Sequence, residues 1–182
     1  LKLQTANGYF LNCNFKTSFN DTALLHHIGY TLDGLLICFE ITGNKDCYNA
    51  VIKSANKLLS KFEVNLELPA YIKPDWSTFC DLGKKKASLC LTGYSQISIV
   101  FQKIARYEND LRFLNAALKI NDIVVAIGNM KYVDNGLCYG ISGSYPINGN
   151  YQDYQVVNWA AKYHAEAALL SLHATAQKKK FC

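Results

Sequence analysis

Apolar residues recur every three or four positions in five stretches of the chain, which is the spacing of the buried face of an α-helix. In the first stretch they run from Leu24 to Phe39, and Gly43 follows where helices commonly end in a left-handed residue. The other stretches are 45–62, 92–105, 110–123 and 154–176. The pattern predicts an all-α fold of five helices, with no sheet beyond a short pairing.

Two segments between these helices, 63–89 and 128–153, lack helical spacing and are punctuated by Pro and Gly. Long connections in a compact domain are usually functional or form a binding surface. Residues 49–53 also match residues 115–119 at an offset of 66 positions. A helical hairpin repeated at this period predicts a curved array or toroid of hairpins. A simple up-down bundle is the alternative, although bundles rarely need two loops of about 25 residues.

The length and composition suit one globular domain. A chain of 182 residues with 50% hydrophobic residues can bury a sizeable core and is too apolar for intrinsic disorder. No apolar run approaches the ~18 residues of a membrane span, so none is expected. We expect a single helical-hairpin domain over residues 1–182. Because the first residue is Leu1 rather than Met, we expect it to be the C-terminal part of a longer chain.

The net charge of +5 comes from 17 Lys and only 2 Arg. Nucleic-acid readers rely on the Arg fork to contact phosphate and guanine. The Lys residues are scattered, apart from clusters at 84–86 and 178–180 that are typical of a solvated loop and a solvated tail. A nucleic-acid partner is therefore not expected.

The seven Cys residues show no CxxC spacing, and their odd number suits neither a disulfide framework nor a zinc ribbon. We expect reduced thiols and hence a cytoplasmic location. No cluster of His, Asp and Glu has the spacing of metal ligands, so the sequence predicts neither a metal nor a cofactor.

Two clusters of candidate site residues begin helices. Residues 24–31 contain His26 and His27, and because adjacent helical residues point apart, at most one of them faces a pocket. That histidine is either a hydrogen-bonded core residue or a site residue acting as acid, base or donor to a sugar. In the second cluster, Thr92 is expected to cap the third helix, and Gln96 lies one turn later on the same face.

The same second cluster contains Cys90, which a helix N-terminus could activate as a nucleophile. A nucleophilic cysteine also needs a base, and the sequence identifies none. We therefore do not expect Cys90 to be catalytic.

The other two clusters combine aromatic rings with amides. Residues 140–151 are too rich in Gly and polar groups for a core element, and contain Tyr145 and Tyr151. Aromatic faces stack on sugar rings and amides bind their hydroxyls, although a well-packed loop is the alternative. In the last helix, Asn158 and Lys162 share a face, while Trp159 is either a core residue or a platform for a ligand.

Taken in order, four motifs resemble a bacterial family of α/α-toroid proteins: LHHIGYT (25–31), CLTGYSQ (90–96), GSYPI (143–147) and NWAAK (158–162). Such proteins are described as prenyltransferase-like, squalene-oxidase-repeat-like or six-hairpin-glycosidase-like, and are associated with polysaccharide biosynthesis. The resemblance spans residues 7 to 170. Residues 87–89 lack the Trp that is usual in the family, and residues 140–143 lack a basic group. The clustered Asp of terpenoid cyclases is also absent, which argues against carbocation chemistry.

The resemblance implies an incomplete (α/α) toroid of repeated helical hairpins, because five helices cannot close a ring of six hairpins. Either residues before Leu1 or a second copy in an oligomer complete the ring, or the domain is an open half-toroid. It also implies a domain that binds or acts on a glycan or sugar nucleotide, as a hydrolase, lyase or epimerase. The alternatives are a non-catalytic binding or assembly module and an isoprenoid-binding, prenyltransferase-like domain.

In a toroid of hairpins the inner helices all start at one end of the molecule, so the four clusters are expected to converge there. We expect His26 as the acid or base, with Tyr145 as its partner. The residues expected to bind the substrate are Gln96, Tyr151, Asn158, Trp159 and Lys162.

Overall fold

The computed structural model of the chain describes residues 1–13, 21–80, 87–128 and 140–178. Its described residues are mostly helical, as the sequence predicts, with four strands of two residues each. The elements in chain order are β1 (Ala23–Leu24), α1 (Leu25–Thr42), α2 (Lys45–Asn65), β2 (Tyr71–Ile72), β3 (Leu89–Cys90), α3 (Leu91–Glu108), α4 (Leu111–Gly128), β4 (Ser144–Tyr145) and α5 (Asn158–Lys178).

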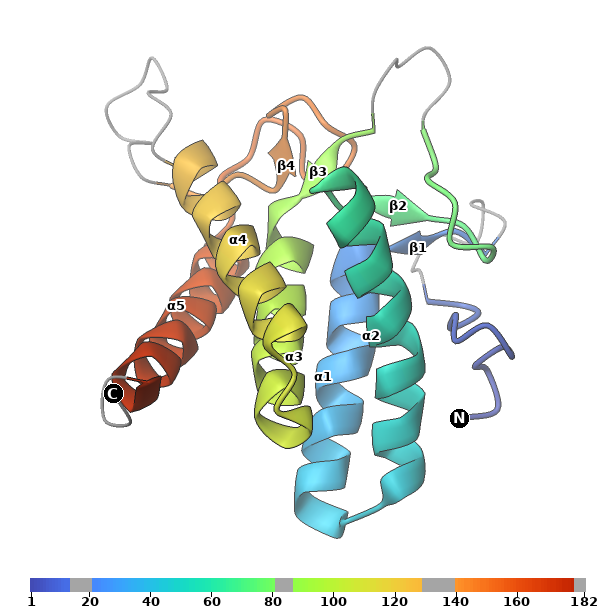
Figure 1. Cartoon of the computed structure of the whole chain (residues 1–182). Helices are drawn as coiled ribbons and strands as arrows, with labels where there is room; N and C mark the ends of the chain where they lie inside the picture. The colour runs from blue at the N-terminus through green and yellow to red at the C-terminus, as the bar shows by residue number, and fades with distance from the viewer. Residues whose placement is uncertain (14–20, 81–86, 129–139, 179–182) are drawn as a thin grey trace.

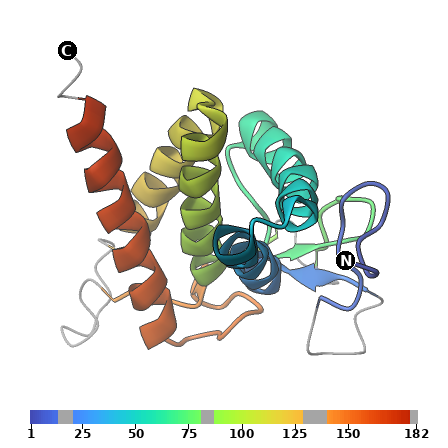
Figure 2. The ribbon, with the colours of Figure 1, turned by 90° about the horizontal axis from the view of Figure 1, so that it is seen from below.

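The helices form two antiparallel hairpins followed by a single helix (Figure 1). A short turn with Gly43 in the left-handed region (φ 69°) separates α1 from α2, and Asn109 (φ 51°) ends α3 in the same way. Helix α3 lies between α1 and α5 and also packs against α4, which makes it the centre of the molecule (Figure 2). Its first turns are buried all around, as expected for a helix with neighbours on three sides.

The two hairpins start their elements at matching positions. β1, α1 and α2 begin at residues 23, 25 and 45, and β3, α3 and α4 begin 66 positions later, at 89, 91 and 111. Helix α5 begins at 158, which is 67 positions after the start of α3. Helices α1 and α3 have the same length of 18 residues. The offset of 66 positions between residues 49–53 and 115–119 therefore also separates the starts of β1 and β3 and those of α1 and α3.

Short backbone pairings connect the starts of α1, α3 and α5 at one end of the molecule, which we call the rim. β1 pairs with β2 and β3 with β4, both antiparallel. Main-chain hydrogen bonds continue the connection from strand to strand and to α5: Leu25 N to Ala70 O, Ala70 N to Ser88 O, Leu91 N to Gly143 O, and Gly143 N to Gln155 O. The rim is therefore held by the main chain as well as by side-chain packing.

The expected bounds of four helices agree with the structure to within a few residues, but the fifth begins later than expected. Residues 154–157 are irregular, with Tyr154 at a positive φ of 56° and Val156 bridged to Ser142. The bridge to Ser142 occupies backbone groups of this segment that would otherwise form helical hydrogen bonds. Consequently α5 starts at Asn158.

Several expectations fall partly or wholly outside the described residues. The side chains of the lysine clusters at 84–86 and 178–180 are outside the description, and so are Cys138 and Cys182. The five cysteines within the described residues are free thiols. Among the described helices, none is long and apolar enough to cross a membrane.

Candidate functional site

Equivalent positions of the three inner helices meet at the rim. The second residues of α1, α3 and α5 are His26, Thr92 and Trp159, and the sixth residues are Tyr30, Gln96 and Tyr163. Tyr151, from the segment before α5, joins them through a hydrogen bond from Trp159 Nε1 to its hydroxyl (2.9 Å). We call these seven residues the rim cluster.

Two glycines bring α1 and α3 into close contact at the cluster. A Cβ atom on Gly93 would lie 2.9 Å from the backbone N of His26, and one on Gly29 would lie 2.7 Å from Cβ of Gln96. Larger side chains would push the helices apart. This close approach places the start of α1 directly over the first turns of α3.

His26 and Gln96 form the centre of the cluster. The Nδ1 of His26 lies 2.7 Å from Oε1 of Gln96, and both side chains are buried. Because a carbonyl oxygen only accepts, this bond places the imidazole proton on Nδ1 and leaves Nε2 with its lone pair. The ring of Tyr30 lies 4.5 Å from the imidazole, and those of Tyr151 and Tyr163 lie 5.6 and 6.3 Å from it, centroid to centroid.

Two polar atoms of α3 remain unsatisfied inside the cluster. Thr92 Oγ1 and Gln96 Nε2 are buried and have no hydrogen-bond partner within the part of the chain that the structure describes. The side chains of Thr92 and Gln96 are 0% and 1% exposed. The phenols of Tyr151 and Tyr163 interact with the side chains of Thr92 and Gln96, which lowers the pKa of each phenol, but neither contact has the geometry of a hydrogen bond to these two atoms. Buried polar atoms without partners are costly and rare, and they commonly mark a place where a ligand or water binds.

Thr92 does not cap α3, contrary to the sequence-based expectation. The cap residue is Cys90, whose Sγ accepts a hydrogen bond from the backbone N of Gly93 at 3.4 Å. Thr92 lies inside the first turn, because the strand β3 continues to Cys90 and the helix begins directly after it. Burial raises the pKa of the Cys90 thiol to about 12, so it is protonated at neutral pH and unsuited to nucleophilic attack.

The cluster is buried on one side and open on the other. His26 is only 7% exposed, whereas Tyr30 and Trp159 are 48% and 37% exposed. Trp159 is held by its hydrogen bond to Tyr151, whose ring centroid in turn lies 5.6 Å from that of the His26 imidazole.

The electrostatics of the cluster favour neutral side chains. Burial lowers the pKa of His26 below its usual range, although the hydrogen bond with Gln96 opposes this shift. Burial raises the pKa of Tyr151 to about 12 and also raises that of Tyr163, which the neighbouring Tyr30 raises further. At neutral pH the cluster therefore presents a neutral imidazole and protonated phenols.

The residues selected from the sequence fall into two groups. His26, Gln96, Tyr151 and Trp159 come together in the rim cluster. Asn158 and Lys162 are exposed: Lys162 binds Glu166 at 2.7 Å, and its Nζ lies 4.0 Å from the ring centroid of Tyr163, at the edge of the rim cluster.

Tyr145 lies in β4 opposite Leu89, half-buried against the hydrophobic core. The phenols whose rings contact His26 in the described structure are those of Tyr30, Tyr151 and Tyr163. Tyr30, Tyr163 and the inward position of Thr92 were missed in the sequence. The 66-residue offset was the available signal, because it aligns Tyr30 with Gln96.

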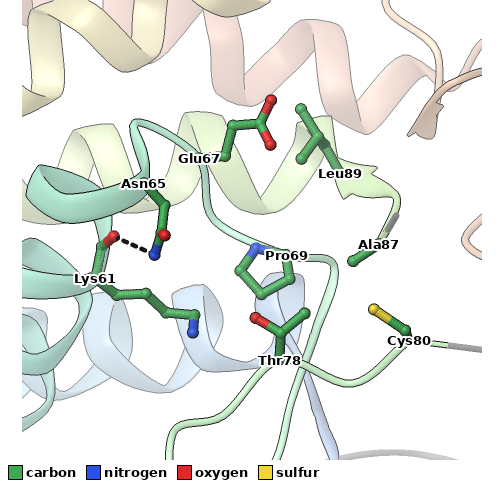
Figure 3. A pocket seen from close by; sticks show the side chains of 8 residues that line it. All are labelled: Lys61, Asn65, Glu67, Pro69, Thr78, Cys80, Ala87 and Leu89. Carbon is green, nitrogen blue, oxygen red and sulfur yellow. Dashed lines mark hydrogen bonds between the residues drawn. The ribbon is translucent and has the colours of Figure 1, made fainter. Parts of the chain in front are cut away.

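Two cavities in the described part of the chain lie away from the rim cluster. One, of about 240 Å³, lies between the end of α2 and α4. The other, of about 270 Å³, has Lys61 and Asn65 on one side and Cys80 and Ala87 on the other (Figure 3). Because residues 81–86, between Cys80 and Ala87, are outside the description, we assign no ligand to this cavity. Among the described residues, no group of three or more His, Cys, Asp or Glu side chains is arranged so that it could hold a metal ion.

Comparison of the chain with protein-family models, with curated proteins and with solved structures finds no match. The functional argument therefore depends on the geometry of the rim cluster.

Proposed function

We propose that this chain is a helical-hairpin domain of the (α/α)-toroid type that binds a glycan or sugar nucleotide at the rim cluster. The matching element starts support the toroid arrangement, with α1, α3 and α5 as inner helices and α2 and α4 as outer ones. One observation carries the ligand assignment. Two buried polar atoms without partners, on Thr92 and Gln96, belong to the same cluster as two exposed aromatic rings, those of Tyr30 and Trp159.

Sugars match this combination of groups. A pyranose ring presents apolar C–H faces that stack on an aromatic ring, and hydroxyls that both donate and accept hydrogen bonds. A hydroxyl oxygen would accept from Gln96 Nε2, and Thr92 Oγ1 could donate or accept. An isoprenoid chain would leave both polar atoms unsatisfied, so the lipid alternative agrees less well with this site.

Proton transfer is the chemistry that the cluster supports if the ligand is turned over. His26 is neutral, with Nε2 available as a base, and protonated phenols surround it as potential acids. None of the seven side chains is a carboxylate, whereas hydrolysis of glycosidic bonds normally uses two. We therefore propose epimerisation or elimination as the reaction class, and binding alone as the second possibility.

The proposal is tested by measuring affinity for a panel of neutral sugars, uronic acids, sugar nucleotides and isoprenoid diphosphates by calorimetry. For the best ligand, Gln96→Met is expected to lower the affinity about tenfold, equivalent to about 1.4 kcal/mol, because an apolar group of similar shape replaces the buried amide.

Gln102 provides the matched control in the same helix. It is also buried, but its Nε2 donates to Ser98 Oγ (3.2 Å) and Ala167 O (2.9 Å). Gln102→Met is expected to lower stability and leave affinity unchanged. If no saccharide or sugar nucleotide binds, or if both variants bind equally well, the proposal is wrong. Binding of the isoprenoid diphosphate alone would favour the lipid alternative.

A further inference from the structure

Two thiols face each other at the turn between α1 and α2. Cys38 lies in the last turn of α1, Cys47 lies in the first turn of α2, and their Sγ atoms are 3.6 Å apart. The turn is well defined on both sides, because Gly43 N donates to Phe39 O and the side chain of Asn44 accepts from Asp46 N. The two sulfur atoms are therefore in contact without any rearrangement of the helices.

We propose that Cys38 and Cys47 form a reactive dithiol that a small-molecule disulfide, such as glutathione disulfide, converts into an intramolecular disulfide. A covalent S–S bond is about 2.05 Å long, so the two sulfur atoms have to approach each other by about 1.5 Å. The site is at the end of the molecule opposite the rim and is independent of the glycan proposal (Figure 1).

The arrangement assigns different roles to the two sulfur atoms. The Cys47 thiol donates to Cys38 Sγ, and this hydrogen bond raises the pKa of Cys47. Cys38 is also the more accessible of the two, because Cys47 is buried. Cys38 is therefore the attacking thiol and Cys47 the resolving thiol.

The reaction has two balanced steps. The Cys38 thiolate attacks glutathione disulfide, breaks its S–S bond, forms a mixed disulfide and releases one glutathione thiolate. Cys47 then loses its proton and attacks Cys38 Sγ, which breaks the mixed disulfide and releases the second glutathione. Two protein thiols are oxidised, one glutathione disulfide is reduced to two thiols, and the two protons pass to the released glutathione.

The bond would strengthen a junction of three helices. Phe39 and Tyr48, which follow the two cysteines in the sequence, have ring centroids 4.7 Å apart, and both contact Tyr107 of α3 (5.5 and 5.7 Å). Tyr48 also donates to Glu108 at 2.7 Å. Closing the loop between Cys38 and Cys47 reduces the freedom of the unfolded chain. The oxidised protein is therefore expected to melt at a higher temperature than the reduced one.

The test is to equilibrate the full chain with glutathione disulfide, block free thiols at acidic pH, and digest with trypsin. The expected product links the peptides 17–45 and 46–53, which contain Cys38 and Cys47 as their only cysteines. The linked product has lost two hydrogens and separates again on reduction. Cys47→Ser is expected to stop at a glutathione adduct on Cys38.

Cys80 provides the control, because it is an exposed thiol of the same chain. It shows that the oxidant is active by acquiring glutathione, and Cys80→Ser should leave the 17–45 to 46–53 link intact. The proposal is overturned if Cys80 is modified while peptides 17–45 and 46–53 stay unlinked. It is also overturned if the link forms equally well in urea, since proximity in the folded protein would then play no part.

Discussion

The imidazole Nδ1 of His26 lies 2.7 Å from Oε1 of Gln96, although 70 positions separate the two residues in the chain. Both side chains are buried, so removing either one leaves the other without a partner. We expect His26→Ala and Gln96→Ala each to lower the free energy of unfolding by about 1–3 kcal/mol.

A double-mutant cycle separates the hydrogen bond from the two truncations. Because the two substitutions remove the same interaction, we expect the double variant to be more stable than the sum of the single effects predicts, by about 0.5–1.5 kcal/mol. Urea denaturation provides the measurement, and His26→Ala with Gln102→Ala is the control cycle. Additive effects at positions 26 and 96 would show that the bond contributes nothing to stability.

Alanine substitutions at two glycines of α1 are expected to change the stability of the protein in opposite directions. A Cβ at Gly29 would lie 2.7 Å from Gln96 Cβ, whereas one at Gly34 would meet no atom within 4 Å. Gly29→Ala is expected to lower stability by about 1–3 kcal/mol through overpacking. Gly34→Ala is expected to raise it by up to about 1 kcal/mol, because Ala is the better helix former. Thermal melts of the two variants decide the point, and a loss at both positions would contradict the open surroundings of Gly34.

One buried and two half-buried histidines predict a loss of stability in mild acid. Burial lowers the pKa of His26, His27 and His164 below the usual value of about 6.5. The unfolded chain therefore takes up protons at pH values where the native protein does not. The contribution of these neutral histidines to the free energy of unfolding is fully present above about pH 6.5. It decreases as the pH falls, by at most about 1.4 kcal/mol per pH unit for each histidine.

Urea denaturation at pH 7.5 and pH 5.5 tests this expectation in a range above the titration of most carboxylates. His164→Phe is expected to reduce the difference between the two values, because it removes one of the three groups. Stability that is constant or increases on acidification would contradict the burial of the imidazoles.

Replacing Gln96 by Glu is expected to change the charge state of His26. A carboxylate next to the imidazole favours the protonated ring, so the pKa of His26 should rise in the variant. The measurement is the pH titration of the His26 ring by NMR, which also reports which nitrogen carries the proton. An unchanged pKa would mean that residue 96 and His26 are not in contact in solution.

The sequence predicted the meeting of His26 with Gln96, Tyr151 and Trp159 because equivalent helix starts in repeated hairpins lie at one end. It did not predict which face of α5 points inward. Asn158 and Lys162 share a face, but spacing alone does not determine the rotation of a helix about its axis. That rotation follows from packing: Ala160 and Ala167 are completely buried, and this turns Trp159 and Tyr163 towards the cluster.

The cap of α3 could not be inferred from local preference either. Thr is a common cap and Cys is not, yet the strand pairing of Cys90 with Ser144 determines where the helix begins. That pairing joins residues more than 50 positions apart. Local signals therefore predicted the helices themselves, while contacts between distant segments determined their exact starts.

The main-chain hydrogen bonds along the rim have a consequence for how this protein can change. Because amide and carbonyl groups are common to nearly all residues, these bonds do not depend on which side chains the rim carries. Substitutions at the second and sixth positions of α1, α3 and α5 are therefore expected to alter the ligand preference of the proposed site while the three helix starts stay in place. The rim combines a frame made by the main chain with replaceable side-chain contacts, which makes it a suitable region for selecting new binding specificities from a library of variants.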